Sequence, residues 1–196
     1  MKELLKKVTE GQNLTREEAA KAMDMMLEGT ASPVLVSAFL TALRMKGETV
    51  DEIVGCTEMM KSKGGSVKLD TDEYIDFVGT GGDGANSFNI STTSMFVCAA
   101  AGVTVAKHGN RAASSKSGAS DLLEALGANI MLEPKQVEQC INETGMGFMN
   151  AMKFHKAMKN VGPIRKEIGI RTIFNMLGPL SNPSNASRQV IGVFST

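Results

Sequence analysis

Four glycines lie within six positions of the segment 79–92, whose sequence is GTGGDGANSFNIST. A short apolar run of strand type, Tyr74 to Val78, precedes this segment, and the apolar run from Met95 to Ala100 after it predicts a buried helix. Glycine has no Cβ atom, so such a segment can take positive φ angles and bring backbone N–H groups close to a ligand. The following helix would point the positive end of its dipole at the same place. The pattern therefore favours an anion, most often phosphate, bound between a strand and a helix.

Two interpretations of this segment remain open on its residues alone. A tight strand-to-helix turn with good N-caps would need the same glycines and short polar side chains. The lysine of the common G-x-x-x-x-G-K-[ST] nucleotide fingerprint is absent. Asp83 is unusual for a bare anion site, and it suits a site that also holds a divalent cation or a sugar hydroxyl.

Residues 1–65 have the pattern of four short helices separated by glycines. Thr15 with Glu18, and Thr49 with Glu52, form capping boxes at the starts of the second and fourth helices. A serine followed by proline at 32–33 marks the start of the third. This part predicts a small helical domain whose spare apolar surface would suit a docking or dimer face, although any single apolar residue in it is more simply explained as a core residue.

From residue 73 the pattern changes to alternating strands and helices. Strands are expected near 74–78, 103–106, 146–151 and 188–194, and helices occupy the sequence between the first three. Such alternation predicts an α/β domain with a mostly parallel sheet. Ligands of these folds lie at the carboxyl ends of the strands, where both glycine-rich loops of this chain fall.

A second loop dense in hydrogen-bond donors follows the expected strand 103–106. Its residues 107–118, KHGNRAASSKSG, suit a polyanionic ligand. We expect Lys107, at the end of the strand, to contact that ligand, whereas Lys116 is equally well explained as a solvated side chain. His108 and His155 are the only histidines of the chain, and each is more simply explained as a hydrogen-bonded structural residue than as a base.

Arg165 follows a Gly-Pro pair that predicts the start of a short helix. A guanidinium at that place could bind a carboxylate ligand with both arms of its fork. An ion pair with Glu167 or another acid of the chain would explain the same residue. The sequence leaves both interpretations open.

Charge and cysteine content exclude several classes of partner. The 196 residues carry a formal net charge of zero, which argues against binding nucleic acid or a membrane by bulk electrostatics. No apolar run reaches the length of about 20 residues that a membrane span needs. Cys56, Cys98 and Cys140 are far apart and odd in number, so we expect reduced core residues in a cytoplasmic protein.

Taken together, three stretches of the chain resemble the anthranilate phosphoribosyltransferases of tryptophan biosynthesis. They are residues 79–92, residues 107–127 (KHGNRAASSKSGASDLLEALG) and residues 154–183 (FHKAMKNVGPIRKEIGIRTIFNMLGPLSNP). The likeness runs in matching order over most of the chain. It implies the nucleoside phosphorylase and phosphoribosyltransferase type of fold, with a helical domain over 1–70 on which 160–180 packs. The α/β domain would then take 71–159 and 181–196, as the first part of a longer domain.

The resemblance also implies the substrates, the metal ion and the assembly. Phosphoribosyl pyrophosphate would bind the α/β domain with Mg²⁺, anthranilate would accept the phosphoribosyl group, and a homodimer would form through the helical domain. Anthranilate would contact Gly79, Asn110 and Arg165, and Ser91 would bind the metal. The implied phosphoribosyl pyrophosphate site consists of Gly79, Gly82, Asp83, Ser87, Asn89, Ile90, Ser91, Thr92, Lys107, His108, Gly109, Asn110, Arg111, Ala112, Ala113, Ser114, Ser115 and Ala119.

The implied chemistry needs no nucleophile or general base from the protein. Pyrophosphate leaves the anomeric carbon through an oxocarbenium-like state, so charge neutralisation of the leaving group and positioning of the amine supply the acceleration. The family places an Asp-Glu pair that holds Mg²⁺ beyond position 196, so we expect this chain alone to be inactive. Lys156 also departs from the family, which usually has proline there.

Two other functions remain as alternatives. Pyrimidine nucleoside phosphorylases share the expected architecture, but their Lys-His-Ser-Thr-Gly-Gly type of loop is not what this chain carries at 79–83 or 107–110. A nucleic-acid-binding relative of the same fold would lack catalysis. The zero net charge and the presence of Asn110 and Arg165 speak against it.

Overall fold

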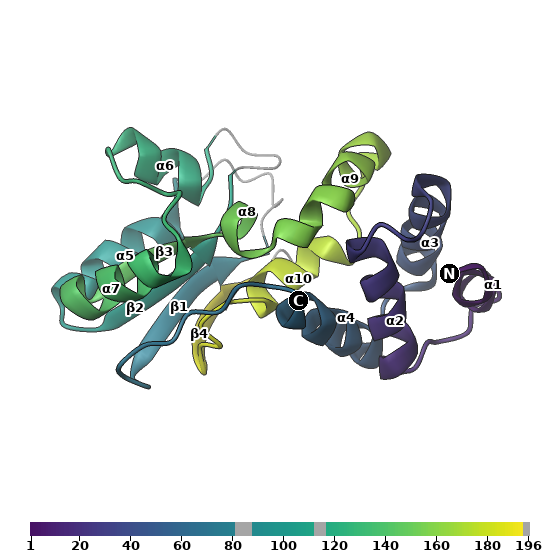
Figure 1. The fold of residues 1–196 in the computed structure, drawn as a ribbon, viewed down its shortest axis with the longest axis horizontal. Coiled ribbons are helices and arrows are strands. Elements are labelled where there is room, and N and C mark those ends of the chain that lie inside the picture. Colours follow the sequence, from purple (N-terminus) through teal and green to yellow (C-terminus); the bar gives the residue numbers. More distant parts are fainter. Residues whose placement is uncertain (81–87, 112–116, 194–196) are drawn as a thin grey trace. The chain divides into compact units, whose positions relative to one another are not determined.

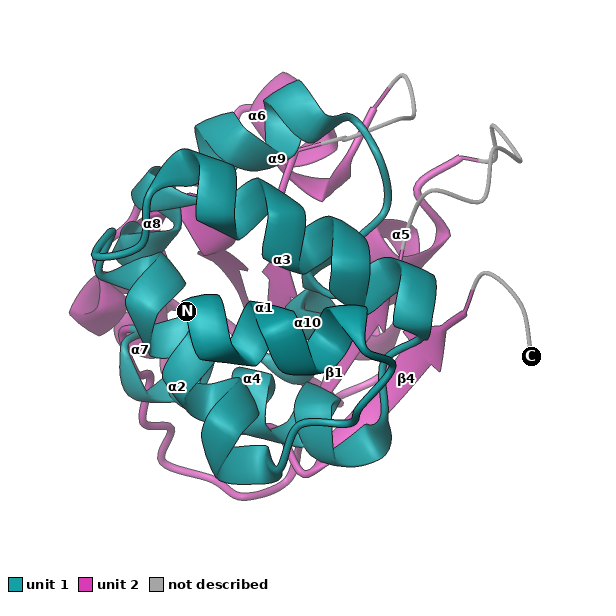
Figure 2. Cartoon of the chain, turned by 90° about the vertical axis from the view of Figure 1, so that its right-hand side faces the viewer, with its two compact units in different colours: residues 1–64, 155–181 teal, residues 65–154, 182–196 magenta. Residues whose placement is uncertain are grey.

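The structure of this chain is a computed structural model that describes residues 1–80, 88–111 and 117–193. The chain forms two compact units, coloured separately in Figure 2. The helical unit consists of Met1–Gly64 and His155–Ser181, and the sheet unit of Gly65–Phe154 and Asn182–Thr196. None of the described helices is both long and apolar enough to cross a membrane.

The helical unit begins with the four helices that the sequence predicts. They are α1 (Lys2–Thr9), α2 (Arg16–Leu27), α3 (Pro33–Lys46) and α4 (Val50–Ser62). Both expected capping boxes form, with Thr15 and Glu18 at α2 and Thr49 and Glu52 at α4. The later segment of this unit adds a 3₁₀ helix, η1 (Lys156–Asn160), and the helices α9 (Gly162–Ile168) and α10 (Phe174–Leu180).

One hydrophobic core serves both segments of the helical unit. Met23, Phe39 and Leu40 come from the first segment, and Val161 and Leu177 from the second. All five side chains are at most 1% exposed. Burial of this apolar surface, rather than helix propensity, holds the short helices of the second segment in place.

A buried ion pair fixes the chain around the start of α4. Glu52 is fully buried and accepts the backbone N–H groups of Leu14 at 2.9 Å and Thr49 at 2.8 Å. Its second oxygen also accepts from Lys46 Nζ at 3.0 Å, and the Lys46 side chain is only 6% exposed. Burial alone would raise the pKa of this carboxyl, but its hydrogen bonds together hold the pKa below the ordinary value.

Among its described residues, the sheet unit has four parallel strands in the order β3-β2-β1-β4 (Figure 1). The strands are β1 (Tyr74–Gly79), β2 (Thr104–Gly109), β3 (Met146–Asn150) and β4 (Arg188–Gly192). The helices of this unit are α5 (Ile90–Ala100), α6 (Ala119–Ala125), α7 (Pro134–Thr144) and α8 (Ala151–Phe154). The predicted combination of a helical N-terminal part with a mostly parallel α/β sheet is confirmed.

The two central strands separate toward their carboxyl ends. The β1–β2 register includes Tyr74 with Thr104 and Ile75 with Val105, and stops there. By contrast, β1 pairs with β4 as far as Gly79. Polar side chains therefore enter the space between β1 and β2, at the end of the sheet where ligands of parallel folds bind.

Two expectations about burial were wrong. Helix α5 is not buried all round, because only one stripe of it, including Thr92 and Met95, packs inward, whereas Val97 is 64% exposed. Cys56 is a core residue as expected, but Cys98 and Cys140 are only partly buried. All three cysteines are free thiols. Each helix of the sheet unit needs only one covered face, so an apolar residue on another face stays accessible.

Candidate functional site

The two glycine-rich loops begin at neighbouring strand ends of the sheet unit. Gly79 closes β1 and Gly109 closes β2, and the strands run parallel, so both loops leave the same edge of the sheet. A Cβ atom on Gly109 would lie 2.8 Å from Phe148 Cε2, which is closer than real side chains approach. A side chain at 109 would therefore force the Phe148 ring of β3 to shift.

The N-terminus of α5 lies between these loops. Its N-cap residue, Asn89, does not cap the helix with its side chain. Instead, Asn89 Nδ2 donates to Ser117 Oγ at 3.1 Å and to the carbonyl of Gly118 at 3.3 Å, which ties the first loop to the second. Ile90 and Ser91 open the helix. The Ile90 N–H donates to the Phe88 carbonyl at 2.7 Å, and the helix dipole favours an anion at this end.

Lys107 places its ammonium group inside the sheet unit, next to this helix start. The side chain is 2% exposed, and Nζ donates to the backbone carbonyl of Phe77 and to Ser91 Oγ, the latter at 3.3 Å. Burial lowers the pKa of Lys107 to about 8, and the carboxylate of Asp76 opposes that shift. A positive charge is thus held directly behind the Ser91 hydroxyl.

The residues after Lys107 differ in their surroundings. His108 is 3% exposed, and its backbone N–H donates to Asp76 Oδ1 at 3.1 Å. Asn110 is exposed, and its side-chain oxygen accepts the N–H of Arg111 at 2.8 Å. The Arg111 guanidinium donates to Asp121 at 2.9 Å and to another carboxylate of α6, so its charge is already balanced.

Two more of the expected site residues belong to α5 and α6. Thr92 is 1% exposed, and its hydroxyl has no hydrogen-bond partner among the described residues. Ala119 is the first residue of α6 and is partly buried. Seven expected site residues lie outside the described part of the chain: Gly82, Asp83, Ser87, Ala112, Ala113, Ser114 and Ser115.

Arg165 belongs to the helical unit, on α9. Its guanidinium carbon lies 5.1 Å from the centroid of the Phe174 ring, a cation–π distance. Burial lowers the pKa of Arg165, and no ion pair of this residue with Glu167 or another acid occurs among the described residues. Of the two interpretations left open by the sequence, the ion pair does not form among the described residues.

His155 has the structural environment expected of a histidine without a catalytic role. It is 4% exposed, and its Nε2 lies 3.1 Å from the carbonyl oxygen of Ser181. Burial lowers its pKa, which keeps the ring neutral at physiological pH. A Cβ atom on Gly64 would lie 3.1 Å from His155 Nδ1, so the ring fills its space closely.

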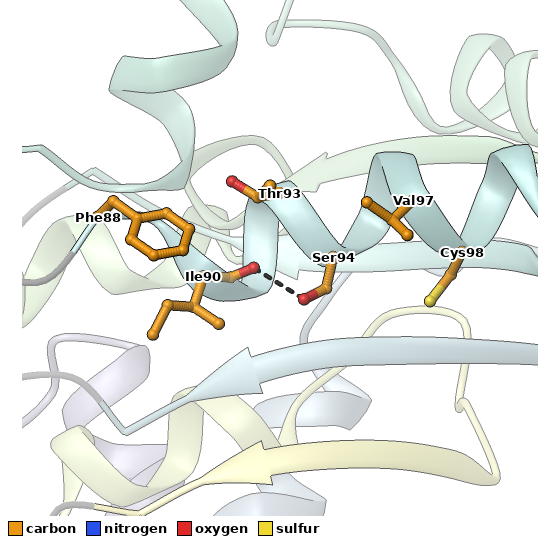
Figure 3. A pocket seen from close by; sticks show the side chains of 6 residues that line it. All are labelled: Phe88, Ile90, Thr93, Ser94, Val97 and Cys98. Atoms are coloured by element: carbon orange, nitrogen blue, oxygen red, sulfur yellow. Dashed lines mark hydrogen bonds between the residues drawn. The ribbon is translucent and has the colours of Figure 1, made fainter.

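A separate hollow of about 190 Å³ runs along the outward face of α5 (Figure 3). It is lined by Phe88, Ile90, Thr93, Ser94, Val97 and Cys98. Ser94 Oγ donates to the Ile90 carbonyl at 2.9 Å, so this hydroxyl is engaged within the helix. Only Ile90 belongs to the expected anion site, and neither Lys107 nor Ser91 lines the hollow.

Asp76 is a polar residue of the site region that the sequence analysis did not select. It lies in the middle of β1 and is completely buried. Its carboxylate accepts His108 N–H through Oδ1 and Gln189 Nε2 at 3.1 Å through Oδ2. An acid in the centre of an apolar strand was the available signal, because a buried carboxylate must be paired.

The metal ligands that the described residues offer are few. No group of three or more His, Cys, Asp or Glu side chains in this part of the chain could hold a metal ion. Ser91 Oγ remains as a hard oxygen ligand at the helix start. It fits Mg²⁺ bound mainly by substrate phosphates, because that ion commonly takes only one or two protein ligands beside phosphates and water.

Comparison with known proteins agrees with this architecture. Residues 2–64 match the model of the glycosyl transferase family, helical bundle domain, and residues 71–196 match that of the glycosyl transferase family, a/b domain. The anthranilate phosphoribosyltransferase of Acetivibrio thermocellus is 56% identical over 195 residues, covering 100% of this chain and 56% of that protein. The corresponding protein of Nitrobacter hamburgensis is 57% identical, covering 100% of this chain and 58% of its own.

Solved structures give the same result. Anthranilate phosphoribosyltransferase from Thermus thermophilus superimposes with a TM-score of 0.92 at 46% identity, covering 98% of this chain and 58% of that one. The Saccharomyces cerevisiae protein of that name, in complex with PRPP and Mg, gives a TM-score of 0.86 at 32% identity, covering 93% and 55%. The chain thus spans less than three fifths of the length of these relatives.

Proposed function

The chain belongs to the glycosyl transferase family of helical bundle and α/β domains, and from this premise we propose that the whole protein is an anthranilate phosphoribosyltransferase. It would transfer the phosphoribosyl group of phosphoribosyl pyrophosphate to the amine of anthranilate, releasing pyrophosphate. Relatives with that name, 56% and 57% identical over the whole chain, support the assignment.

The observation that carries the proposal is the contact between Lys107 and Ser91 at the start of α5. A buried ammonium and a hydroxyl meet there at the N-terminus of a helix, whose dipole is positive at that end. Such an arrangement binds a diphosphate better than a neutral ligand, because each of these groups stabilises negative charge. We assign the diphosphate of the sugar substrate to this place.

The proposed reaction needs stabilisation of charge more than proton transfer. As the bond to the anomeric carbon breaks, negative charge grows on the leaving pyrophosphate, where Lys107 and the N–H groups of α5 would neutralise it. Mg²⁺, held by Ser91 and by substrate oxygens, would supply further neutralisation when bound. The aromatic amine of anthranilate is neutral at pH 7, so neither His108 nor His155 is needed as a base.

We assign the anthranilate carboxylate to Arg165, with Asn110 and Gly79 as further contacts. The guanidinium of Arg165 has no carboxylate partner among the described residues, and its stacking on Phe174 pre-orients the fork. An arginine held in this way can bind a benzoate group through two parallel hydrogen bonds. In the sheet unit, the exposed side chain of Asn110 can offer its amide N–H groups to anthranilate as hydrogen-bond donors.

We also propose a homodimer formed through the helical unit of a cytoplasmic protein. Three large apolar side chains of α3 and α4 are strongly exposed: Val34 at 78%, Met45 at 83% and Val50 at 75%. Such exposure on short helices supports an interface with a second copy. The three free thiols agree with a reducing compartment.

The test uses the polypeptide extended to the length of its relatives. With phosphoribosyl pyrophosphate and Mg²⁺, we expect the fluorescence of anthranilate to fall as product forms. Absence of turnover, together with phosphorolysis of uridine or thymidine, would replace the proposal by a nucleoside phosphorylase. Strongly salt-dependent DNA binding without turnover would instead favour a nucleic-acid-binding relative.

A further inference from the structure

We propose that Asp76 is a positioning residue for the diphosphate site. Its carboxylate holds Lys107 against Ser91 and holds the start of the second loop against β1. This inference rests on the proposed function and adds a residue to it. Asp76 touches no substrate in this assignment. It acts through the two residues that follow each other at the end of β2, Lys107 and His108.

The Asp76 carboxylate lies where the backbone pairing of β1 with β2 has ended. The β1–β2 register ends at Ile75 and Val105, yet the chain of β2 continues toward the loop. Beyond that point the carboxylate of Asp76 accepts the backbone N–H of His108 at 3.1 Å, where a ladder bond would otherwise be needed. The carboxylate thus replaces backbone pairing and fixes where the second loop begins.

Asp76 and Lys107 are also buried groups of opposite charge. Lys107 is 2% exposed and Asp76 is completely buried, so neither charge is well solvated. The oxygens that Lys107 Nζ contacts, the Phe77 carbonyl and the Ser91 hydroxyl, are both neutral. Asp76 is the carboxylate whose field stabilises the ammonium. A buried ammonium keeps its position only if such a countercharge stays in place.

Asp76 is itself held from the other side. Gln189 of β4 donates to Oδ2 at 3.1 Å, and the side chain of Asn182 lowers the pKa of the carboxyl against the larger effect of burial. Asn182 Nδ2 additionally donates to the Ala106 carbonyl of β2 at 3.0 Å. Two side chains of the segment that forms and precedes β4 therefore act on the carboxylate, which suits a residue that orients others rather than one that reacts.

Asp76→Asn is the informative variant, because the amide keeps the size of the side chain and one acceptor for His108 N–H while it removes the charge. In the polypeptide of full family length, we expect the KM for phosphoribosyl pyrophosphate to rise roughly tenfold or more, since each 1.4 kcal/mol of lost interaction is a factor of ten. The KM for anthranilate should change less than about twofold. Asp72→Asn, an exposed acid of the same segment, is the matched control and should leave both constants unchanged.

A merely structural role of Asp76 would give a different pattern. Loss of folded protein would lower the active concentration and kcat while leaving both KM values alone, and thermal unfolding would report it. Should Asp76→Asn fail to fold, Gln189→Met is the second variant. It removes the hydrogen bond from the half-buried Gln189 to Asp76 Oδ2 and should raise only the KM for phosphoribosyl pyrophosphate.

Calorimetry with phosphoribosyl pyrophosphate and Mg²⁺ distinguishes a failure of the proposed function from a failure of the positioning role of Asp76. If the wild-type protein gives no binding heat, the proposed function fails and this inference fails with it. If the wild type binds and folded Asp76→Asn or Gln189→Met binds equally well, the proposed function stands and the positioning role of Asp76 is wrong. Weaker binding by the folded variants, with unchanged Asp72→Asn, supports it.

Discussion

The guanidinium of Arg165 lies over the ring of Phe174, with 5.1 Å between the guanidinium carbon and the ring centroid. Stacking leaves the edge of the guanidinium plane, which carries its N–H donors, free to bind a planar anion. The position of this fork is set within the helical unit itself, because Phe174 is a core residue that is 5% exposed.

Replacement of Arg165 by alanine should therefore weaken anthranilate binding selectively. A hydrogen bond to a charged group contributes roughly 1.5–3 kcal/mol, so we expect the KM for anthranilate to rise roughly 10- to 100-fold. The KM for phosphoribosyl pyrophosphate should stay nearly unchanged in the same steady-state assay. Lys166→Ala, at an exposed neighbour on α9, is the control. An equal loss for both substrates would contradict the assignment of Arg165 to anthranilate.

Ser91→Ala should change the dependence of activity on Mg²⁺. The variant removes the one hydroxyl oxygen that we assign to the metal, while Lys107 keeps the Phe77 carbonyl as an acceptor. We expect the Mg²⁺ concentration for half-maximal rate to rise roughly tenfold, within the range seen when the surroundings of a metal site are altered. Ser94→Ala removes a hydroxyl one turn further along α5, where it bonds the Ile90 carbonyl, and should behave as wild type. An unchanged Mg²⁺ profile in Ser91→Ala would exclude Ser91 as a metal ligand.

The parts of the fold that depend on local sequence could be predicted. Capping boxes need residues only three positions apart, so Thr15 and Thr49 marked the starts of α2 and α4 directly. Between the expected strands 103–106 and 146–151, where the sequence predicts helices, the structure has α7 over Pro134–Thr144, because proline opens it and Gly145 closes it in the left-handed conformation. Alternation of strands and helices likewise predicted the parallel sheet.

Contacts over long sequence distances could not be predicted in this way. Lys107 was expected at a strand end with its charge toward a ligand, but the sequence did not indicate that its ammonium turns back onto the carbonyl of Phe77. The partners of Asp76 come from residues 108, 182 and 189, so its burial becomes apparent only when the sheet is assembled. Similarly, the apolar run of α5 did not show which face the sheet leaves uncovered, and Val97 was therefore misjudged.

Glu52→Gln should destabilise the helical unit more than the loss of a surface ion pair would. The variant leaves the Lys46 ammonium buried with a neutral partner, and breaking a buried pair typically costs about 3–5 kcal/mol. Urea unfolding monitored by circular dichroism would measure the free energy of unfolding. Glu58→Gln, on the same helix as Glu52, breaks an exposed pair with Arg16 of α2 and should lower the free energy of unfolding far less.

The lowered pKa of Glu52 predicts how the free energy of unfolding responds to acid. In the folded state the pKa of Glu52 is held below its ordinary value. The ionised carboxylate therefore stabilises the fold fully at pH values above its ordinary pKa, and this stabilisation is lost as the pH falls through the folded-state pKa. The loss should be smaller in Glu52→Gln, which has no carboxyl to protonate. Identical acid profiles for the variant and the wild type would show that Glu52 is not stabilised as the structure indicates.

The burial of the Cys56 thiol predicts that the free energy of unfolding falls at alkaline pH. Its side chain is 1% exposed, and burial raises the pKa of the thiol from 9.0 to about 12. Between these values the unfolded chain releases a proton that the folded chain keeps, so stability falls as the pH rises above 9.0 and is unaffected below it. By pH 10.5 the difference should be about 2 kcal/mol, at 1.36 kcal/mol for each pKa unit. Urea unfolding of the wild type and of Cys56→Ala across this range isolates the effect, because all other titrating groups are shared.

At pH 8, a thiol reagent should modify the partly exposed Cys98 and Cys140 in the folded protein, and Cys56 only after unfolding. Rapid modification of Cys56 in the native state, or parallel alkaline profiles of the two proteins, would contradict its place in the core.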